Sequence, residues 1–202
     1  MPRRIPQQKR SKQKVDAIIR HTLRIIENEG YPRATTARIA KEAGIGLASL
    51  YEYFENRDDI ILAALELEAA AVWRAVESGL LKINELGPVE GLRYALHVTM
   101  SEVTRRAGSV QILLSNFPGV IRHPAVVKLN TRLEATLRFV LISMSNGTEI
   151  QNLDTKAFLL TNTVMGIFLG VATGLPEGVT EEDLIDEIVT AAQTLLGIQK
   201  PD

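Results

Sequence analysis

The stretch that decides the fold runs from Thr35 to Arg57 and reads TTARIAKEAGIGLASLYEYFENR. Two short helical patterns meet in it across a turn bracketed by Gly44 and Gly46. Thr35 or Thr36 can cap the first helix, because a hydroxyl accepts a hydrogen bond from an unpaired backbone N–H of the first turn. Gly44 can adopt the left-handed backbone conformation that commonly ends a helix. The pattern therefore predicts a helix-turn-helix.

The second predicted helix, Leu47 to Phe54, has an unusual outward face. Leu50 and Phe54 are four residues apart and face inward together. A solvated helix face is normally rich in Glu and Lys, but here the outward residues are small, apolar or hydroxyl-bearing, namely Leu47, Ala48, Ser49 and Tyr53. A helical hairpin of any all-α protein would fit the spacing as well. The basic residues on both sides favour a nucleic-acid contact instead.

Many positions between Ile18 and Arg57 fall in one register with a known family. They are Ile18-Ile19, Gly30-Tyr31, Thr35-Thr36, Ile39-Ala40, Ala43-Gly44-Ile45, Leu50-Tyr51, Tyr53-Phe54 and Arg57. In this register the first third of the chain resembles TetR-type bacterial transcriptional regulators. The resemblance implies an all-α homodimer, with a three-helix DNA-binding domain followed by a helical domain for effector binding and dimerisation. The rest of the chain matches the family only in length and helical character.

The resemblance also implies which residues would contact DNA. Phosphates would be held by Thr36, Tyr51, Tyr53 and Arg57, and base edges would be faced by Gly46, Leu47, Ala48 and Ser49. Leu47 and Ala48 cannot hydrogen-bond a base, so discrimination is expected to depend on thymine methyl groups, on Ser49 and on DNA shape. Ala37 stands where relatives carry a long polar side chain, which removes one further base contact.

The net charge of −1 hides an uneven distribution. Residues 1–57 contain 12 Lys and Arg against 6 Asp and Glu, whereas residues 58–202 contain 11 against 18. The arm from Met1 to Lys14 has no acids and is expected to be flexible, adding phosphate contacts or reaching the minor groove. We therefore predict a DNA-binding domain at residues 1–57 and an effector-binding and dimerisation domain at residues 58–202.

Several functional classes are disfavoured by what the sequence lacks. The chain has no cysteine, which excludes disulfides, thiolate zinc sites and thiol redox chemistry. No apolar run follows the basic start, so no signal peptide is expected and the predicted location is cytoplasmic. His21, His97 and His123 are too scattered for a metal site, and no phosphate-binding loop occurs. No catalytic residue, metal or cofactor is predicted, and an all-α enzyme is the weaker alternative.

The remainder of the chain reads as helices separated by glycine and proline breaks. Asn56 can cap a long helix whose first turn contains Asp58 and Asp59, which complement the helix dipole. The predicted helices are Ser11 to Glu29, Arg57 to Leu81, Val89 to Ala107, Ser109 to Ser115, Ala125 to Ser145, Asp154 to Thr173 and Glu181 to Leu196.

Ala157 to Leu175 contains no charged residue and spaces Gly166, Gly170 and Gly174 four apart. A membrane helix with a small-residue face would have this composition. The polar residues around Asn162 and the missing basic or aromatic anchors favour a helix buried between its own domain and a second copy of the chain. The predicted dimer interface contains Asn162, Gly166, Gly170, Ile185, Ile188, Val189 and Ala192.

The second domain also supplies candidates for an apolar effector pocket. They are Trp73, His97, Met100, Gln111, Leu113, Phe117, Phe139, Asn162, Met165 and Phe168. Ordinary core packing explains each of them singly, and only the set as a whole suggests a hydrophobic effector. The expected partners are double-stranded operator DNA and a small molecule that releases a repressor from a palindromic site. An effector-less helix-turn-helix protein, with a filled core and no cavity, is the main alternative.

Overall fold

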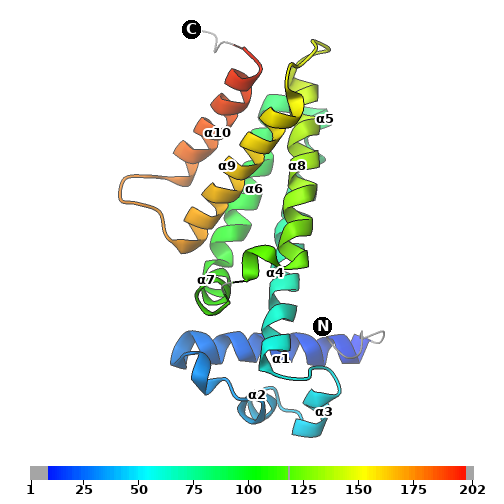
Figure 1. Cartoon of the computed structure of the whole chain (residues 1–202), viewed down its shortest axis with the longest axis vertical. Coiled ribbons are helices and arrows are strands. Elements are labelled where there is room, and N and C mark those ends of the chain that lie inside the picture. Colours follow the sequence, from blue (N-terminus) through cyan, green and yellow to red (C-terminus); the bar gives the residue numbers. More distant parts are fainter. Residues whose placement is uncertain (1–8, 118, 199–202) are drawn as a thin grey trace. The chain divides into compact units, whose positions relative to one another are not determined.

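The computed structural model describes residues 9–117 and 119–198. Within these ranges the chain forms helices and no strand, which confirms the predicted all-α class. In chain order (Figure 1) the elements are α1 (Lys9–Glu29), the 3₁₀ helix η1 (Tyr31–Arg33), α2 (Thr36–Glu42), α3 (Leu47–Tyr51), α4 (Arg57–Leu80), α5 (Ile83–Leu86), α6 (Pro88–Arg105), α7 (Ala107–Asn116), the 3₁₀ helix η2 (Val120–Arg122), α8 (Pro124–Met144), α9 (Leu153–Thr173) and α10 (Glu181–Leu195).

The chain divides into two compact units. We call them the head, which comprises Met1–Glu68 and Gly108–Ile121, and the body, which comprises Ala69–Ala107 and Arg122–Asp202. α4 therefore begins in the head and ends in the body. α7 belongs with the head, although it lies far from the other head helices in sequence. The functional division predicted after residue 57 stays a prediction.

Some element boundaries differ from the predicted ones. α1 begins at Lys9, so residues 9–14 of the expected flexible arm are helical, as suits a run of Lys, Arg and Gln with good helix propensity. Residues 1–8 lie outside the described residues. α3 ends at Tyr51 rather than Phe54. The four-residue helix α5 and the two 3₁₀ helices are too short to show a periodic pattern.

The turn between α2 and α3 is closed by backbone hydrogen bonds around Gly44. Gly44 has a positive φ of 67°. The N–H of Ile45 donates to the carbonyl of Ala40 at 3.0 Å, and the N–H of Gly44 donates to that of Lys41 at 3.1 Å. These two bonds form a Schellman C-cap. At the other end of α2 the hydroxyl of Thr35 accepts from the N–H of Arg38 at 3.3 Å, as the sequence predicts.

The head is held together by an apolar core drawn from α1 to α4. Its fully buried members are Ile18, Ile39, Leu50, Phe54, Ile60 and Ile61, all at 0% exposure. The start of α4 is fixed by Asn56, whose Oδ1 accepts from the N–H of Asp59 at 2.9 Å. The predicted cap is therefore confirmed. The same side chains that fold the head leave the first residues of α3 outside the core.

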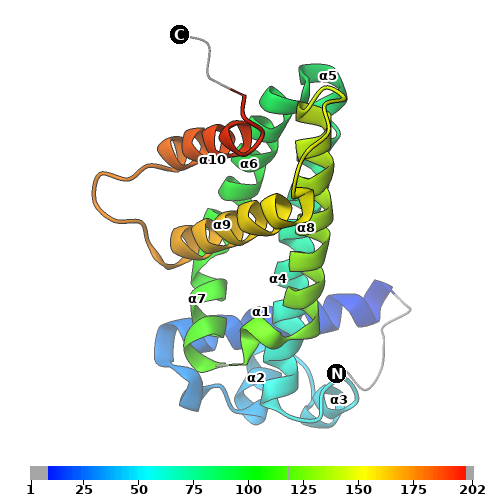
Figure 2. The same cartoon turned by 45° about the horizontal axis from the view of Figure 1, so that its top comes forward.

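In the body, α8 and α9 lie side by side, and α10 packs along α6 and α9 (Figures 1 and 2). Charged pairs on the surface join neighbouring helices: Arg93 of α6 with Asp186 of α10, and Arg138 of α8 with Asp154 of α9. The start of α10 is closed by a capping box of Thr180 and Asp183. The hydrogen bonds from Thr180 lower the pKa of the Asp183 carboxyl.

α4 and α6 approach each other closely at Gly79. A Cβ at this position would lie 2.4 Å from Cα and 2.6 Å from Cβ of Ala95. Carbon atoms in van der Waals contact are about 3.5 to 4.0 Å apart. The close approach of these two backbones therefore requires glycine at position 79.

Gly79→Ala should destabilise the protein by roughly 1 to 3 kcal/mol, because the added methyl group overpacks the contact with Ala95. Helix propensity alone predicts the opposite sign, a gain of about 1 kcal/mol. Urea unfolding followed by circular dichroism measures the difference. Ser78→Ala, at the exposed neighbouring position, should change the free energy of unfolding by about 0.5 kcal/mol or less. A stabilised Gly79→Ala variant would show that α4 and α6 are not in close contact there.

Candidate nucleic-acid interface and body cavity

α3 presents the predicted outward face. The side chains of Leu47 and Tyr51 are 41% and 40% exposed, and Ala48 is exposed as well. Ser49 is half-buried, whereas Leu50 is fully buried. Gly46 is the N-cap residue of α3 and brings no side chain to the turn. The exposed apolar residues thus belong to a short helix whose Leu50 is buried in the core of the head.

Two hydroxyl groups predicted to hold phosphate lie together. Thr36 Oγ1, at the first residue of α2, is 3.0 Å from the hydroxyl oxygen of Tyr51, at the last residue of α3. Their spacing in sequence does not reveal this contact, which the turn between the helices creates. Either hydroxyl can donate to the other, and the one that accepts keeps its own O–H to donate to an anionic oxygen outside the protein.

Tyr53 does not lie where the sequence placed it. It is only 6% exposed, so the prediction that it faces outward is wrong. α3 ends at Tyr51, and the chain from Glu52 onward turns toward the core, where the N–H of Tyr53 donates to the carbonyl of Leu50 at 3.0 Å. A helical register extended past Tyr51 therefore assigns the wrong direction to the ring.

Arg57 is held inside the head by Tyr31. Its guanidinium carbon lies 3.6 Å from the centroid of the Tyr31 ring, and its Nη1 donates to the Tyr31 carbonyl at 2.9 Å. The Tyr31 hydroxyl donates to Asp58, and the Tyr31 ring meets Phe117 edge-on at 5.8 Å between centroids. Burial raises the pKa of Tyr31, and the bond to Asp58 raises it further. Tyr31 thus links the start of α4 to the end of α7.

A second arginine of the head also has an acidic partner. Arg38 of α2 donates through Nη1 to Glu29 Oε2 at 2.6 Å, and a second bond joins the same two side chains. The bonded guanidinium lowers the pKa of Glu29, and the carboxylate raises the pKa of Arg38. The pair fixes the end of α1 to α2. Arg38 and Arg57, two of the basic residues within 1–57, therefore already have an acidic neighbour within the head.

Tyr31→Leu should lower the free energy of unfolding by roughly 1 to 2 kcal/mol, since it removes the cation–π contact with Arg57 and the edge-on contact with Phe117. Tyr31→Phe keeps the ring and loses only the hydroxyl, so it should cost about 0.5 kcal/mol. Urea unfolding of both variants gives the comparison. Equal losses would show that the hydroxyl, rather than the ring, provides the stabilisation.

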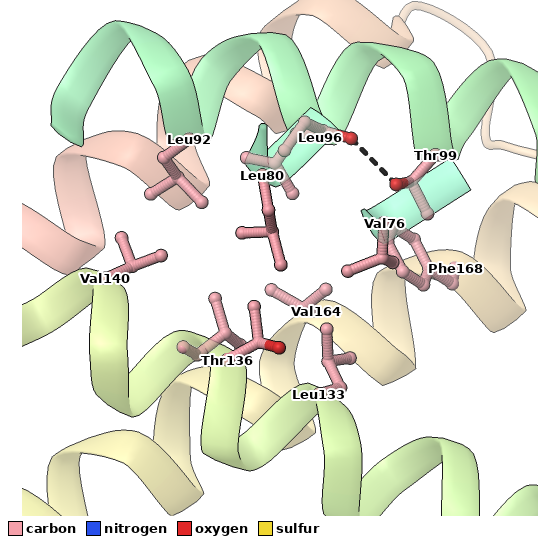
Figure 3. A pocket seen from close by; sticks show the side chains of 12 residues that line it. Val76, Leu80, Leu92, Leu96, Thr99, Leu133, Thr136, Val140, Val164 and Phe168 are labelled. Carbon is pink, nitrogen blue, oxygen red and sulfur yellow. Dashed lines mark hydrogen bonds between the residues drawn. The ribbon is translucent and has the colours of Figure 1, made fainter. Parts of the chain in front are cut away.

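A small cavity lies in the core of the body, between α4, α6, α8 and α9 (Figure 3). Its volume is about 20 Å³. The lining residues are Val76, Leu80, Leu92, Ala95, Leu96, Thr99, Leu133, Thr136, Leu137, Val140, Val164 and Phe168. The wall is therefore apolar apart from two threonine hydroxyls, and the space corresponds to about one water molecule.

Of the residues predicted to form a pocket, only Phe168 lines this cavity. His97, Gln111, Phe139 and Asn162 are exposed, and Met100 is buried in the core without reaching the cavity. Leu113 and Phe117 belong to the head. Met165 is half-buried, and the guanidinium of Arg132 lies over the ring of Trp73. The structure therefore brings only Phe168 of this set to the cavity, and an effector pocket formed by the set stays a prediction. Helical spacing indicates which side of a helix is apolar, but not which apolar positions converge.

Four residues of the predicted dimer interface are also placed differently. Ile185, Ile188, Val189 and Ala192 are at most 2% exposed within the single chain, so they cannot meet a second copy. The α10 stripe instead packs on α6 and α9 of its own body. Asn162 and Gly166 of α9 are exposed, and Gly170 is half-buried.

The outer side of α9 is apolar. Phe158, Leu159 and Leu169 are 55%, 52% and 41% exposed. A Cβ at Gly166 or Gly170 would meet nothing within 4 Å. An open groove of about 370 Å³ runs between α9 and α10 and is lined by Leu159, Leu160, Thr163, Glu187, Thr190, Ala191, Thr194 and Leu195.

One helix of the described residues, α9, is long and apolar enough by composition to cross a membrane. Buried core helices of soluble proteins pass the same test, and 39% of its most apolar window is buried in the body. Among residues 9–117 and 119–198, no group of three or more His, Cys, Asp or Glu side chains could hold a metal ion.

A helix-turn-helix head followed by an all-helical body is the architecture of a class of DNA-associated regulators. Residues 18–64 match the sequence model of the family described as bacterial regulatory proteins, tetR family. The family assignment thus rests on residues 18–64, which lie within the head.

The similar proteins agree with this assignment. The HTH-type transcriptional regulator PksA of Bacillus subtilis (strain 168) is 33% identical over 90 residues, which are 45% of this chain and 41% of PksA. The chain thus spans about half the length of the curated relatives it matches.

Solved structures share the fold at low sequence identity. A TetR-like transcriptional regulator from Rhodococcus sp. RHA1 has a TM-score of 0.66 and 22% identity, over 96% of this chain and all of that chain. AibR, solved in complex with isovaleryl coenzyme A and operator DNA, has a TM-score of 0.61 and 19% identity, over 87% of this chain and 96% of AibR.

Proposed function

We propose that the protein is a cytoplasmic transcriptional repressor that binds a palindromic operator as a homodimer and is released by a small hydrophobic effector. The observation that carries the DNA-binding part is the exposed face of α3 together with the Thr36 and Tyr51 hydroxyls, which lie 3.0 Å apart. The exposed face of α3 carries apolar and hydroxyl groups, and no residue of Leu47–Tyr51 is acidic, so this face suits a DNA groove better than water.

The residues of α3 divide by the kind of DNA contact that they can make. Leu47 and Ala48 can contact thymine methyl groups, and Ser49 can hydrogen-bond a base edge, so these side chains would specify sequence. Thr36 and Tyr51 would hold a phosphate and position the helix. Two-fold symmetry would place two copies of α3 in successive major grooves about 34 to 36 Å apart.

Arg57 keeps its predicted phosphate contact as part of the proposal, but its substitution is a poor test. Arg57→Ala would remove the contacts with Tyr31 at the same time as any contact with DNA. A loss of affinity would then have two explanations. The neutral hydroxyl of Tyr51 offers a cleaner experiment, because Tyr51→Phe removes one oxygen from an exposed side chain.

Tyr51→Phe should weaken binding to every operator sequence by roughly tenfold, because each half-site loses one phosphate hydrogen bond worth about 0.5 to 1.5 kcal/mol. Its salt dependence should stay unchanged, since no charge is removed. Ser49→Ala should instead alter the preferred sequence. Selection from random double-stranded DNA, followed by gel-shift titrations at several salt concentrations, measures both effects.

Tyr94→Phe is the matched control, since Tyr94 of α6 is 40% exposed, as Tyr51 is, but lies in the body. It should bind DNA like the unchanged protein. Thr36→Val and Tyr51→Phe should be non-additive in combination, because the two oxygens are in contact. A change of sequence preference on Tyr51→Phe, or no loss at all, would contradict the proposed phosphate contact.

The exposed face of α9 supports a homodimer. A face that combines Phe158, Leu159 and Leu169 with two open glycines allows a second helix to approach closely. Covering such a face removes apolar surface from water, which is the main favourable term in association. A second copy of the same chain would also provide the two-fold symmetry that a palindromic operator requires.

Leu159→Lys should convert the dimer into monomers at low micromolar concentration, because a charge at the centre of an apolar interface costs on the order of 2 kcal/mol or more. Analytical ultracentrifugation measures the change. Leu81→Lys, at a side chain that is 75% exposed at the end of α4, should leave the oligomeric state as it is. An unchanged dimer in the Leu159→Lys variant would place the interface elsewhere.

The effector part of the proposal rests on the apolar wall of the body cavity and on the bound isovaleryl coenzyme A of AibR. α4 contributes Val76 and Leu80 to the cavity and begins in the head at Arg57. A ligand that displaces this part of α4 could therefore change the spacing of the two α3 helices. Release requires that the ligand bind the wrongly spaced state more tightly.

An effector-less DNA-binding protein is the second candidate, and the size of the cavity favours it. The body cavity itself, at about 20 Å³, is too small to hold a metabolite as it stands. Under this alternative the body would serve dimerisation alone. The two candidates differ in whether an apolar ligand binds the body and lowers operator affinity.

A further inference from the structure

The wall of the body cavity restricts the chemistry of any ligand that enters it. The hydroxyl of Thr99 already donates to the Ala95 carbonyl at 2.7 Å (Figure 3). Within residues 9–117 and 119–198, the hydroxyl of Thr136 has no hydrogen-bond partner. Every other lining side chain is a hydrocarbon. A buried polar group without a partner is costly, so the part of a ligand inside this wall must be mostly apolar.

A cation stands one helical turn away from the cavity. Arg132 of α8 directly precedes the lining residue Leu133 and is four residues before Thr136. Trp73 of α4 is three residues before the lining residue Val76. Side chains three or four residues apart on a helix are neighbours, about 5 to 6 Å between Cβ atoms. Arg132 and Trp73 are therefore each about one helical turn from a residue that lines the cavity.

These two side chains contact each other. The guanidinium carbon of Arg132 lies 5.1 Å from the centroid of the Trp73 ring. In the described part of the chain no carboxylate pairs with Arg132, whereas Arg93 and Arg138 of the same body each pair with an aspartate. Arg132 is exposed and keeps its charge available beside the apolar wall.

We propose that the cavity and Arg132 together form a binding site for a single-chain amphiphile with an anionic head group. The tail would separate the cavity side chains, and the head would be bound by the guanidinium of Arg132. Two parallel N–H donors of a guanidinium fit an anionic head group, and such charge-assisted bonds are stronger than a solvent-exposed cation–π contact. This inference rests on the proposed effector-controlled function and names the chemistry of the effector.

The small cavity volume is part of the inference. A space of about 20 Å³ holds roughly one water molecule and cannot take an alkyl chain as it stands. Such a ligand must therefore bind a conformation in which the lining helices are further apart. A ligand that prefers one conformation shifts the equilibrium toward it. The conformation with the small cavity is thus the ligand-free state, and the conformation with separated helices is the ligand-bound state.

Trp73 provides the measurement, because it is the only tryptophan in the chain. Decanoate and 1-decanol, both below the concentration at which they aggregate, are titrated while the tryptophan fluorescence is recorded. Decanoate should bind about tenfold more tightly than 1-decanol, which carries the same tail without a charge. Arg132→Gln should abolish this preference and leave the affinity for 1-decanol unchanged. Lys128→Gln, an exposed cation one turn earlier on α8, should keep it.

Val164→Phe tests the tail separately. It fills the cavity, so it should weaken both probes and leave their ratio unchanged. Circular dichroism confirms that each variant is folded. The inference is overturned if the unchanged protein binds both probes equally, if it binds neither, or if Arg132→Gln keeps the preference.

Gel-shift titrations with the selected operator distinguish failure of the proposed ligand site from failure of the proposed DNA-binding function. Operator binding without binding of either probe would refute the ligand site and leave DNA binding intact. Probe binding without affinity for any double-stranded DNA would refute the proposed regulator and support the ligand site. Decanoate should also reduce the operator affinity of the unchanged protein and not that of Arg132→Gln.

Discussion

The head depends on one backbone constraint, the left-handed conformation of Gly44 in the turn between α2 and α3. It lets the N–H groups of Gly44 and Ile45 bond back to carbonyls of α2. Any residue with a Cβ would pay about 1 kcal/mol or more for this conformation. The closed turn directs Leu50 into the core. It also brings the first residue of α2 beside the last residue of α3, so that Thr36 and Tyr51 meet.

The helices of the fold could be predicted from the sequence because they follow local rules. The spacing of apolar residues predicts α1, α4, α6, α8, α9 and α10. The cap residue Asn56 is predicted because its side chain can accept from a backbone N–H of the first turn of α4, as it does. Tyr53 shows a limit of these local rules. The expected helix includes Tyr53, but α3 has five residues and ends at Tyr51. The Tyr31 and Arg57 contact joins residues 26 apart through a turn, and no periodic pattern encodes it.

The body cavity shows a second limit of sequence reasoning. Its lining uses residues from four helices, and the choice among apolar positions depends on how the helices are rotated and spaced. Gly79 sets one such spacing, because its missing side chain brings α4 against Ala95 of α6. Ala95 is itself a lining residue. The close contact and the cavity are therefore neighbouring consequences of the same helix pair.

The composition of α9 follows from its two apolar sides. Ala157, Leu160, Val164 and Phe168 are buried in the body, whereas Phe158, Leu159 and Leu169 remain exposed on the other side. A helix of this kind lacks a charged face, which is why its sequence also satisfies the length and hydropathy of a membrane helix. The α10 stripe completes the core of the body within one chain. Because that core is complete without a partner, the exposed side of α9 can be altered to change association while the body keeps its own stability.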